Sequence, residues 1–257
     1  TNRGVMHAFK DSDGSEAWGF IPREQLSRLQ LLSDNITDHD YYVDASPVVF
    51  DDGTNKTLFF GERRGSYHYY ALDITNPVGP TYKYVINQNL LAIVDSDNDG
   101  NLDGTGANLG QSWTSPTAHT IKTAADTHEN VFLMAGGYDK NQDLAAPATE
   151  DTEGRAVFAI NVSDGSLSAL NFNAVNFSDM THCITDVMGF DSNGDTYTNR
   201  VYAGDLAGNL WAFEDDDSNF LDAVIGGDGT WSGRKLFSAS GDDAVPRKIF
   251  YAPDVVT

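Results

Sequence analysis

Residues 95–103 place four aspartates and two asparagines within nine positions and have the spacing of a metal-binding loop. Oxygen-bearing side chains stand at positions 1, 3, 5 and 9, Gly100 at position 6 allows a sharp turn, and position 7 offers a main-chain carbonyl. This is the ligand order of an EF-hand calcium loop. Four carboxylates this close together repel one another until a cation lies among them. The segment therefore predicts a Ca²⁺ site whose ligands are Asp95, Asp97, Asp99, Asn101 and Asp103.

This first loop departs from a complete EF-hand in one ligand and in its surroundings. Position 12 is Gly106, so the bidentate Glu of an EF-hand is missing, and the preceding residues 90–94 are typical of a strand. We therefore expect a calcium loop on a β scaffold, with a dissociation constant on the order of 10⁻⁴ to 10⁻³ M. Oxygen ligands in a flexible ring favour Ca²⁺ over Zn²⁺ or Mg²⁺. The alternative is an acidic turn that holds no metal.

A second loop, residues 191–199, has a related but less complete pattern. Gly194 stands at position 4, Thr196 stands at position 6, and the loop carries only two carboxylates. The candidate ligands are Asp191, Asn193, Asp195, the main-chain carbonyl of Tyr197, and Asn199. A hairpin turn held by Asx hydrogen bonds explains the same residues equally well, so both alternatives stay open. Asp139, Asn141 and Asp143 also alternate, but nothing else in the sequence supports a site there.

No constellation of catalytic residues is recognisable in the sequence. None of the six histidines has a partner at the spacing of a metal site, so we expect them to be structural. A nucleophile elbow, a P-loop and a dinucleotide fingerprint are all missing from the sequence. Cys183 is the only cysteine and falls in a predicted strand, where a small buried side chain is the usual role. The residues therefore give no support for a catalytic site.

The charge and the composition exclude some classes of partner and of fold. The formal net charge of -22 repels phosphate backbones, which argues against a nucleic-acid partner. No run of 18 apolar residues occurs, so the sequence predicts no membrane span in this chain. Asp supplies 31 of the 38 acidic side chains, and Asp favours turns over helices. With 40% hydrophobic residues, the chain is predicted to be a folded, turn-rich domain rather than a disordered acidic tail.

The elements that must carry these loops repeat along the chain. A strand-like segment with a central Ala and a polar turn residue at its end occurs at residues 5–10, 68–73, 156–161 and 209–214. A second pattern, which precedes the first in each repeat, occurs at residues 43–49, 113–117, 184–187 and 251–255. A third pattern lies between the second and the first, at residues 58–62, 131–137 and 201–205. A fourth strand follows the turn at residues 17–21 and 82–86. Four antiparallel strands repeated about every 70 residues predict an all-β propeller, and a pair of β-sandwiches is the alternative.

The phase of the repeat predicts how the chain divides. Residues 1–257 form a single β-propeller domain in this interpretation, with a partial blade at each end and about three whole blades between. A closed ring of four blades is possible, but we favour a fragment of a larger propeller. Leucines at helical spacing after Pro22 predict one short helix over residues 23–32, between two blades.

The sequence resembles the C-terminal propeller of the PilC/PilY type IV pilus-tip adhesins over nearly its whole length. The similarity is carried by residues 4–9, 20–23, 42–47, 70–75 and 200–211. The most specific piece is the Asp/Asn-rich loop joined directly to a strand that reads Arg200-Val201-Tyr202-Ala203-Gly204-Asp205. That family usually has Gly at position 6 and Asp at position 9 of this loop, where this chain has Thr196 and Asn199.

The resemblance implies a calcium-regulated, non-enzymatic protein of the pilus tip. It implies support of pilus assembly, opposition to retraction, and attachment to a host or abiotic surface. The partners it implies are pilus-tip or minor pilin subunits, and the location is the cell surface, the pilus tip or the outer membrane. The first alternative is a quinoprotein-like (PQQ) dehydrogenase propeller, which the single cysteine and four scattered tryptophans argue against. The second is a propeller lectin or matrix-binding module, which differs mainly in its target.

Overall fold

The computed structural model describes residues 3–33, 40–87, 108–124, 126–145, 150–215, 229–239 and 247–255. Within these ranges the protein consists of one two-stranded sheet and three four-stranded sheets, all antiparallel. In each sheet the strands lie in chain order, so each strand pairs with its neighbour in the sequence. This confirms the predicted all-β fold with propeller blades of four antiparallel strands. The division into a single domain over residues 1–257 stays a prediction.

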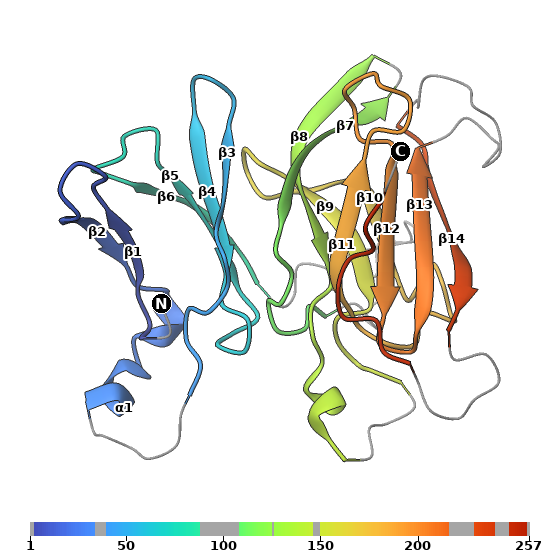
Figure 1. Ribbon diagram of the computed structural model, residues 1–257, viewed down its shortest axis with the longest axis horizontal. Helices are drawn as coiled ribbons and strands as arrows, with labels where there is room; N and C mark the ends of the chain where they lie inside the picture. The colour runs from blue at the N-terminus through green and yellow to red at the C-terminus, as the bar shows by residue number, and fades with distance from the viewer. Residues whose placement is uncertain are drawn as a thin grey trace, which may run out of the picture.

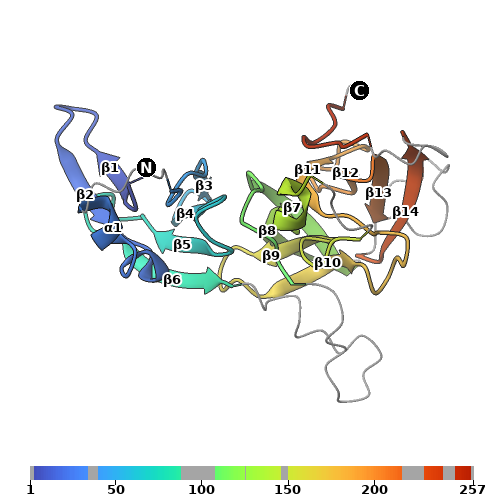
Figure 2. The same ribbon diagram turned by 90° about the horizontal axis from the view of Figure 1, so that it is seen from below.

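The sheets follow one another in chain order along the molecule, as Figures 1 and 2 show from two directions. The first contains β1 (Met6–Phe9) and β2 (Glu16–Phe20). The second contains β3 (Val48–Asp51), β4 (Lys56–Gly61), β5 (Tyr69–Asp73) and β6 (Thr81–Ile86). The third contains β7 (Thr117–Ala124), β8 (Thr127–Ala135), β9 (Ala156–Asn161) and β10 (Leu167–Asn173). The fourth contains β11 (Ile184–Phe190), β12 (Arg200–Asp205), β13 (Asn209–Asp215) and β14 (Trp231–Ser238).

The hydrophobic core lies between consecutive sheets. Successive residues of a strand point to opposite faces, so one strand supplies two cores. On β4, Phe59 stacks on Phe132 of the third sheet at 4.5 Å between ring centroids. The next residue, Phe60, lies edge to face with Phe20 of the first sheet at 6.0 Å. Phe59 and Phe60 are both fully buried, and each central sheet is therefore held from two sides, as a propeller blade is.

Short Asx turns between the strands use several of the aspartates. In the hairpins of the first three sheets, the carboxylate of the turn residue accepts the main-chain N–H two positions on, at 2.8 to 2.9 Å. These bonds join Asp13 to Ser15, Asp73 to Thr75 and Asp164 to Ser166. Side chains that accept such bonds stabilise a turn without any metal.

The structure differs from the sequence-based prediction at three of the four segments expected as first strands, whereas β11 contains the remaining one, residues 184–187. Residues 43–47 and 113–116 are not strands, and β3 and β7 begin directly after Pro47 and Pro116. Proline has no N–H for the ladder and therefore sets the strand start. Residues 251–255, also expected as strand, form none in the described part of the chain.

The predicted helix over residues 23–32 is also divided. The structure has a 3₁₀ helix η1 (Arg23–Gln25) and a short helix α1 (Leu29–Ser33). The break lies where Gln25 and Arg28 both donate to the carbonyl of Gly65, at 3.2 and 2.8 Å. A second 3₁₀ helix, η3 (Lys140–Asp143), follows β8. Among the described residues, no helix has the length and apolar character needed to cross a membrane.

Candidate cation-binding sites

The first predicted calcium loop lies outside the described residues. Asp95, Asp97, Asp99, Asn101 and Asp103 all fall between residues 87 and 108, where the structure describes nothing. Calcium binding by this loop stays a prediction, and so does the strand expected over residues 90–94.

The second predicted loop connects β11 to β12 and closes around Asp191. One oxygen of the Asp191 carboxylate accepts the N–H groups of Asn193 and Gly194 at 3.1 and 2.7 Å. The other oxygen accepts the N–H of Thr196 at 2.7 Å. Thr196 has a φ of +78°, a left-handed conformation that is rare for a β-branched residue. The loop therefore keeps at position 6 the backbone conformation for which calcium loops use glycine.

The other candidate ligands of this loop also face its own main chain. The side-chain oxygen of Asn193 accepts the N–H of Asp195 at 3.2 Å, and Asp195 accepts that of Tyr197 at 2.9 Å. Asn199 accepts the N–H of Ser192 at 2.9 Å and ties the two ends of the loop together. The structure thus brings all five predicted residues into one compact turn held by Asx hydrogen bonds. Whether calcium binds there stays a prediction.

A lysine from the neighbouring blade reaches this loop. The ammonium of Lys122, on β7, lies 2.8 Å from Asp195 Oδ2 and 5.0 Å from the centroid of the Tyr197 ring. Burial alone would raise the pKa of Asp195, but Lys122 and the Tyr197 N–H hold that pKa below its ordinary value. One of the two carboxylates already faces a cation, so Ca²⁺ would compete with Lys122 for Asp195.

The third acidic segment, around Asp139, is used to hold the chain together. Asp139 accepts the N–H groups of Asn141 at 2.8 Å and of Thr152 at 2.8 Å. Asp143 accepts the hydroxyl of Tyr138 and pairs with Arg64, each at 2.8 Å. These contacts explain the alternation of oxygen side chains here without a metal.

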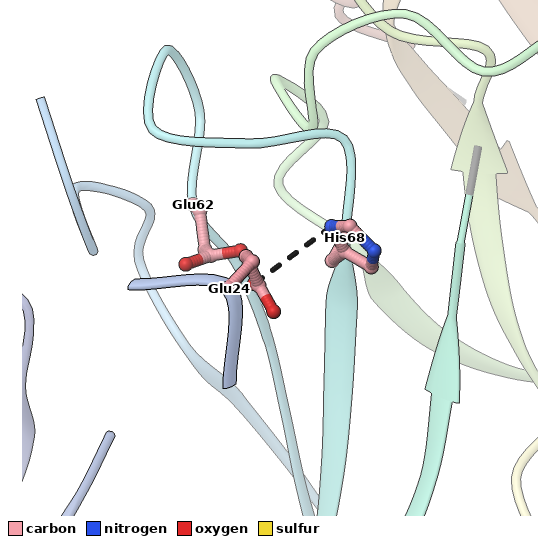
Figure 3. A group of neighbouring side chains, drawn as sticks. All are labelled: Glu24, Glu62 and His68. Atoms are coloured by element: carbon pink, nitrogen blue, oxygen red, sulfur yellow. Dashed lines mark ion pairs between the residues drawn. The ribbon is translucent and has the colours of Figure 1, made fainter. Parts of the chain in front are cut away.

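One cluster of metal-ligating side chains had no signal in the sequence. Glu24, Glu62 and His68 each offer a ligand atom, and these atoms lie within 4.8 Å of one another. Figure 3 shows the three side chains pointing toward each other. Glu24 belongs to η1 after the first sheet, Glu62 directly follows β4, and His68 directly precedes β5. The fold assembles the group from two blades, so no local spacing could reveal it.

Burial dominates the electrostatics of this cluster. Glu62 is fully buried, and its Oε1 accepts the Gln25 amide at 2.8 Å. Its Oε2 has no hydrogen-bond donor among the described residues. Burial and the neighbouring Glu24 carboxyl raise the pKa of Glu62 to about 9. Burial also opposes ionisation of Glu24, but hydrogen bonds from Glu62 and from the Tyr70 hydroxyl lower its pKa. The pair therefore holds one proton at neutral pH in the absence of a metal.

Comparison with known proteins agrees with the architecture. The family model described as the PilY1 beta-propeller domain matches residues 1–255. A type IV pilus biogenesis factor PilY1 from Pseudomonas aeruginosa strain PAO1 is 28% identical over 99% of this chain and 21% of its own length. A PilY1 homolog from Xylella fastidiosa is 29% identical over 82% of this chain and 13% of its own length. The chain thus spans about a fifth or less of these relatives.

A solved structure shows the same fold. The crystal structure of the Pseudomonas aeruginosa PilY1 C-terminal domain aligns with a TM-score of 0.64 at 23% identity. The alignment covers 99% of this chain and 48% of that one, so the solved domain continues well beyond the matched part. Because the family model matches almost every residue and three of the four described sheets are four-stranded propeller blades, this chain belongs to the PilY1 β-propeller domain family.

Proposed function

We propose that this chain is the propeller part of a type IV pilus biogenesis factor that supports pilus assembly, opposes retraction and mediates surface attachment. The observation that carries the proposal is the family match over residues 1–255, on a chain whose described sheets are propeller blades. The relatives that align with almost the whole chain are named as pilus biogenesis factors. Shared sequence over a shared fold supports a shared role.

The proposed role is binding rather than catalysis. Propeller blades present loops at their edges, and such loops carry binding sites on a rigid scaffold. We propose that these surfaces contact pilus-tip or minor pilin subunits on one side and a host or abiotic surface on the other. The protein then acts outside the cell, at the pilus tip or on the outer membrane.

We further propose that Ca²⁺ regulates this role through the first loop. Asp95, Asp97, Asp99, Asn101 and Asp103 would hold the ion, because hard oxygen ligands in this order suit calcium. When bound, the ion supplies positive charge that lets the four carboxylates share one turn and orders the edge of the propeller. The second loop is a further candidate, in competition with Lys122.

Two experiments test the role and the ion separately. Removing the propeller from the protein in its own bacterium is expected to abolish surface pili, counted after shearing. Unchanged pili would contradict a role in assembly, and recovery of pili in a strain that cannot retract them would assign the role to opposing retraction.

The ion is tested by calorimetric titration of Ca²⁺ into the wild type and Asp97→Ala. Asp13→Ala is the matched control, since Asp13 belongs to an ordinary Asx turn. We expect weaker calcium heats only in Asp97→Ala, and equal heats in all three would contradict the proposed site.

A further inference from the structure

We propose that Glu24, Glu62 and His68 form a site for a divalent transition-metal ion such as Zn²⁺, which ties the first blade to the second. The geometry comes first: the three ligand atoms converge within 4.8 Å (Figure 3). The second observation is independent of their proximity. Glu62 is 0% exposed, and its Oε2 accepts no hydrogen bond from a described residue, so only a proton shared with Glu24 or a bound cation can satisfy it. A buried carboxylate oxygen without a partner is costly unless a cation or a proton satisfies it.

The donor set selects the class of metal. One imidazole nitrogen and two carboxylate oxygens suit zinc and its first-row neighbours, whereas calcium takes six to eight oxygen ligands. A tetrahedral zinc ion with bonds near 2.1 Å separates its ligands by about 3.4 Å. The Nδ1 of His68 and the Oε1 of Glu24 lie 3.7 Å apart, so small side-chain movements bring them to that separation. The fourth position is left for water.

Neighbouring groups orient the ligands and leave a route for the ion. Gln25 holds one oxygen of Glu62, and the Tyr70 hydroxyl holds Oε2 of Glu24, so the other oxygen of each carboxylate is available. Such contacts raise metal affinity because they fix the ligands before binding. The His68 and Glu24 side chains are 31% and 26% exposed, which gives the ion access from solvent.

One existing contact must give way. The Ser66 hydroxyl hydrogen-bonds to His68 Nδ1, and the metal would take that nitrogen in its place. The main-chain N–H of His68 donates to the same hydroxyl at 3.2 Å, which keeps Ser66 in position after the change. The competing occupant of the cluster is the proton shared by Glu24 and Glu62, and the experiment must separate the two.

The bond that a metal would add joins two blades. Glu24 arrives from the chain that leaves the first sheet, while Glu62 and His68 flank the turn between β4 and β5. That turn already packs closely against the segment that leads into β3, because a Cβ on Gly65 would lie 1.7 Å from the carbonyl oxygen of Tyr42. A metal ion at this place would therefore stiffen the junction and raise the stability of the folded chain.

The test is titration of the full chain with Zn²⁺, and with Co²⁺ for its visible absorption, in saturating Ca²⁺ that fills the oxygen-only loops. The variants are Glu62→Gln, His68→Gln and Gln25→Ala, with His7→Gln as the matched control. His7 pairs with Glu16 at 2.8 Å on the surface, but the described residues offer that pair no third ligand. Glu62→Gln keeps the acceptor for Gln25 and resembles the protonated acid, so it is expected to fold.

We expect the wild type and His7→Gln to bind one Zn²⁺, with a rise in melting temperature and a tetrahedral Co²⁺ spectrum. Glu62→Gln and His68→Gln should bind more than about 100-fold more weakly, because each lacks a ligand, and Gln25→Ala about 10-fold to 100-fold more weakly. Equal zinc affinity in the wild type and Glu62→Gln would overturn the proposal. Failure of the wild type to bind Zn²⁺ or Co²⁺ would also overturn it and leave the shared proton as the occupant.

Discussion

The carboxylate of Asp205 holds the turn between β12 and β13, and replacing it with Asn should strongly destabilise the fourth sheet. Asp205 is fully buried, and its Oδ1 accepts the N–H groups of Ala207 and Asn209, each at 2.9 Å. Its Oδ2 accepts the side-chain amide of Asn209 at 2.9 Å and the indole N–H of Trp211 at 2.8 Å. Four donors therefore converge on one buried anion.

The size of the effect follows from these four bonds. An Asn side chain can present its oxygen to the two main-chain donors, but its NH₂ group then faces the donors of Asn209 and Trp211. Two hydrogen bonds to a charged group are lost, worth about 1.5–3 kcal/mol each. Burial raises the pKa of Asp205 in spite of its four donors, so desolvation of the charge offsets part of their value. We expect Asp205→Asn to lower the free energy of unfolding by about 3 kcal/mol.

The assay is urea unfolding followed by tryptophan fluorescence, since Trp211 lies beside the substitution. The matched control is Asp164→Asn, in an exposed Asx turn where the carboxylate accepts from the main-chain N–H and the hydroxyl of Ser166. This control should change stability by less than about 0.5 kcal/mol. A loss below about 1 kcal/mol for Asp205→Asn, or equal losses for both variants, would refute the reasoning.

Three further predictions concern the second loop and its surroundings. Thr196→Gly should stabilise the chain by about 1 kcal/mol in thermal unfolding, because it relieves the left-handed φ of +78°, and a loss of stability would contradict this. Lys122→Gln removes the ammonium that pairs with Asp195 and should therefore increase calcium binding by the second loop. The measurement is calorimetry of a chain that also carries Asp97→Ala, so that the first loop contributes no calcium heat. Unchanged heats would show that Lys122 does not compete with calcium. Burial lowers the pKa of His119 to about 4, so the unfolded chain binds a proton that the folded one does not. The neutral, partly buried His119 therefore makes its full contribution to the stability of the folded chain above about pH 6.5. As the pH falls toward 4 this contribution is lost, and the free energy of unfolding decreases by about 2 kcal/mol after allowance for the partial exposure of His119. His119→Gln should remove this loss in urea unfolding at the two pH values, and an unaltered pH dependence would contradict the assignment.

The fold was predictable because each blade is a local structure. Its four strands are consecutive, so the alternation of apolar residues and the Asp-rich turns appear in order along the chain. The starts of β3 and β7 directly after Pro47 and Pro116 could have been predicted, because proline lacks an N–H group for the ladder. The repeat pattern led us to expect earlier starts. The divided helix could not be predicted, because its break depends on the docking of Gln25 and Arg28 on a turn of the next blade.

The candidate sites also divide into local ones, which the sequence can indicate, and ones formed between blades, which it cannot. The Asp191 loop is local, and the sequence placed all its members correctly in one turn. Lys122 reaches it from the neighbouring blade, and Glu24 meets Glu62 and His68 only after the first two blades pack. Residues that meet only between blades show no regular spacing in the sequence. No spacing pattern therefore grouped His68 with Glu24 and Glu62, and we expected this histidine to be structural.

The most direct test of calcium-regulated pilus biogenesis is the number of surface pili at low and high Ca²⁺ in a strain that carries Asp95→Ala and Asp97→Ala together. The control strain carries Asp11→Ala and Asp13→Ala, which remove two carboxylates from the first hairpin instead. We expect calcium to increase piliation in the wild type and the control, while the double variant stays at its low-calcium level. Equal piliation of the double variant and the wild type at both calcium concentrations would contradict the account.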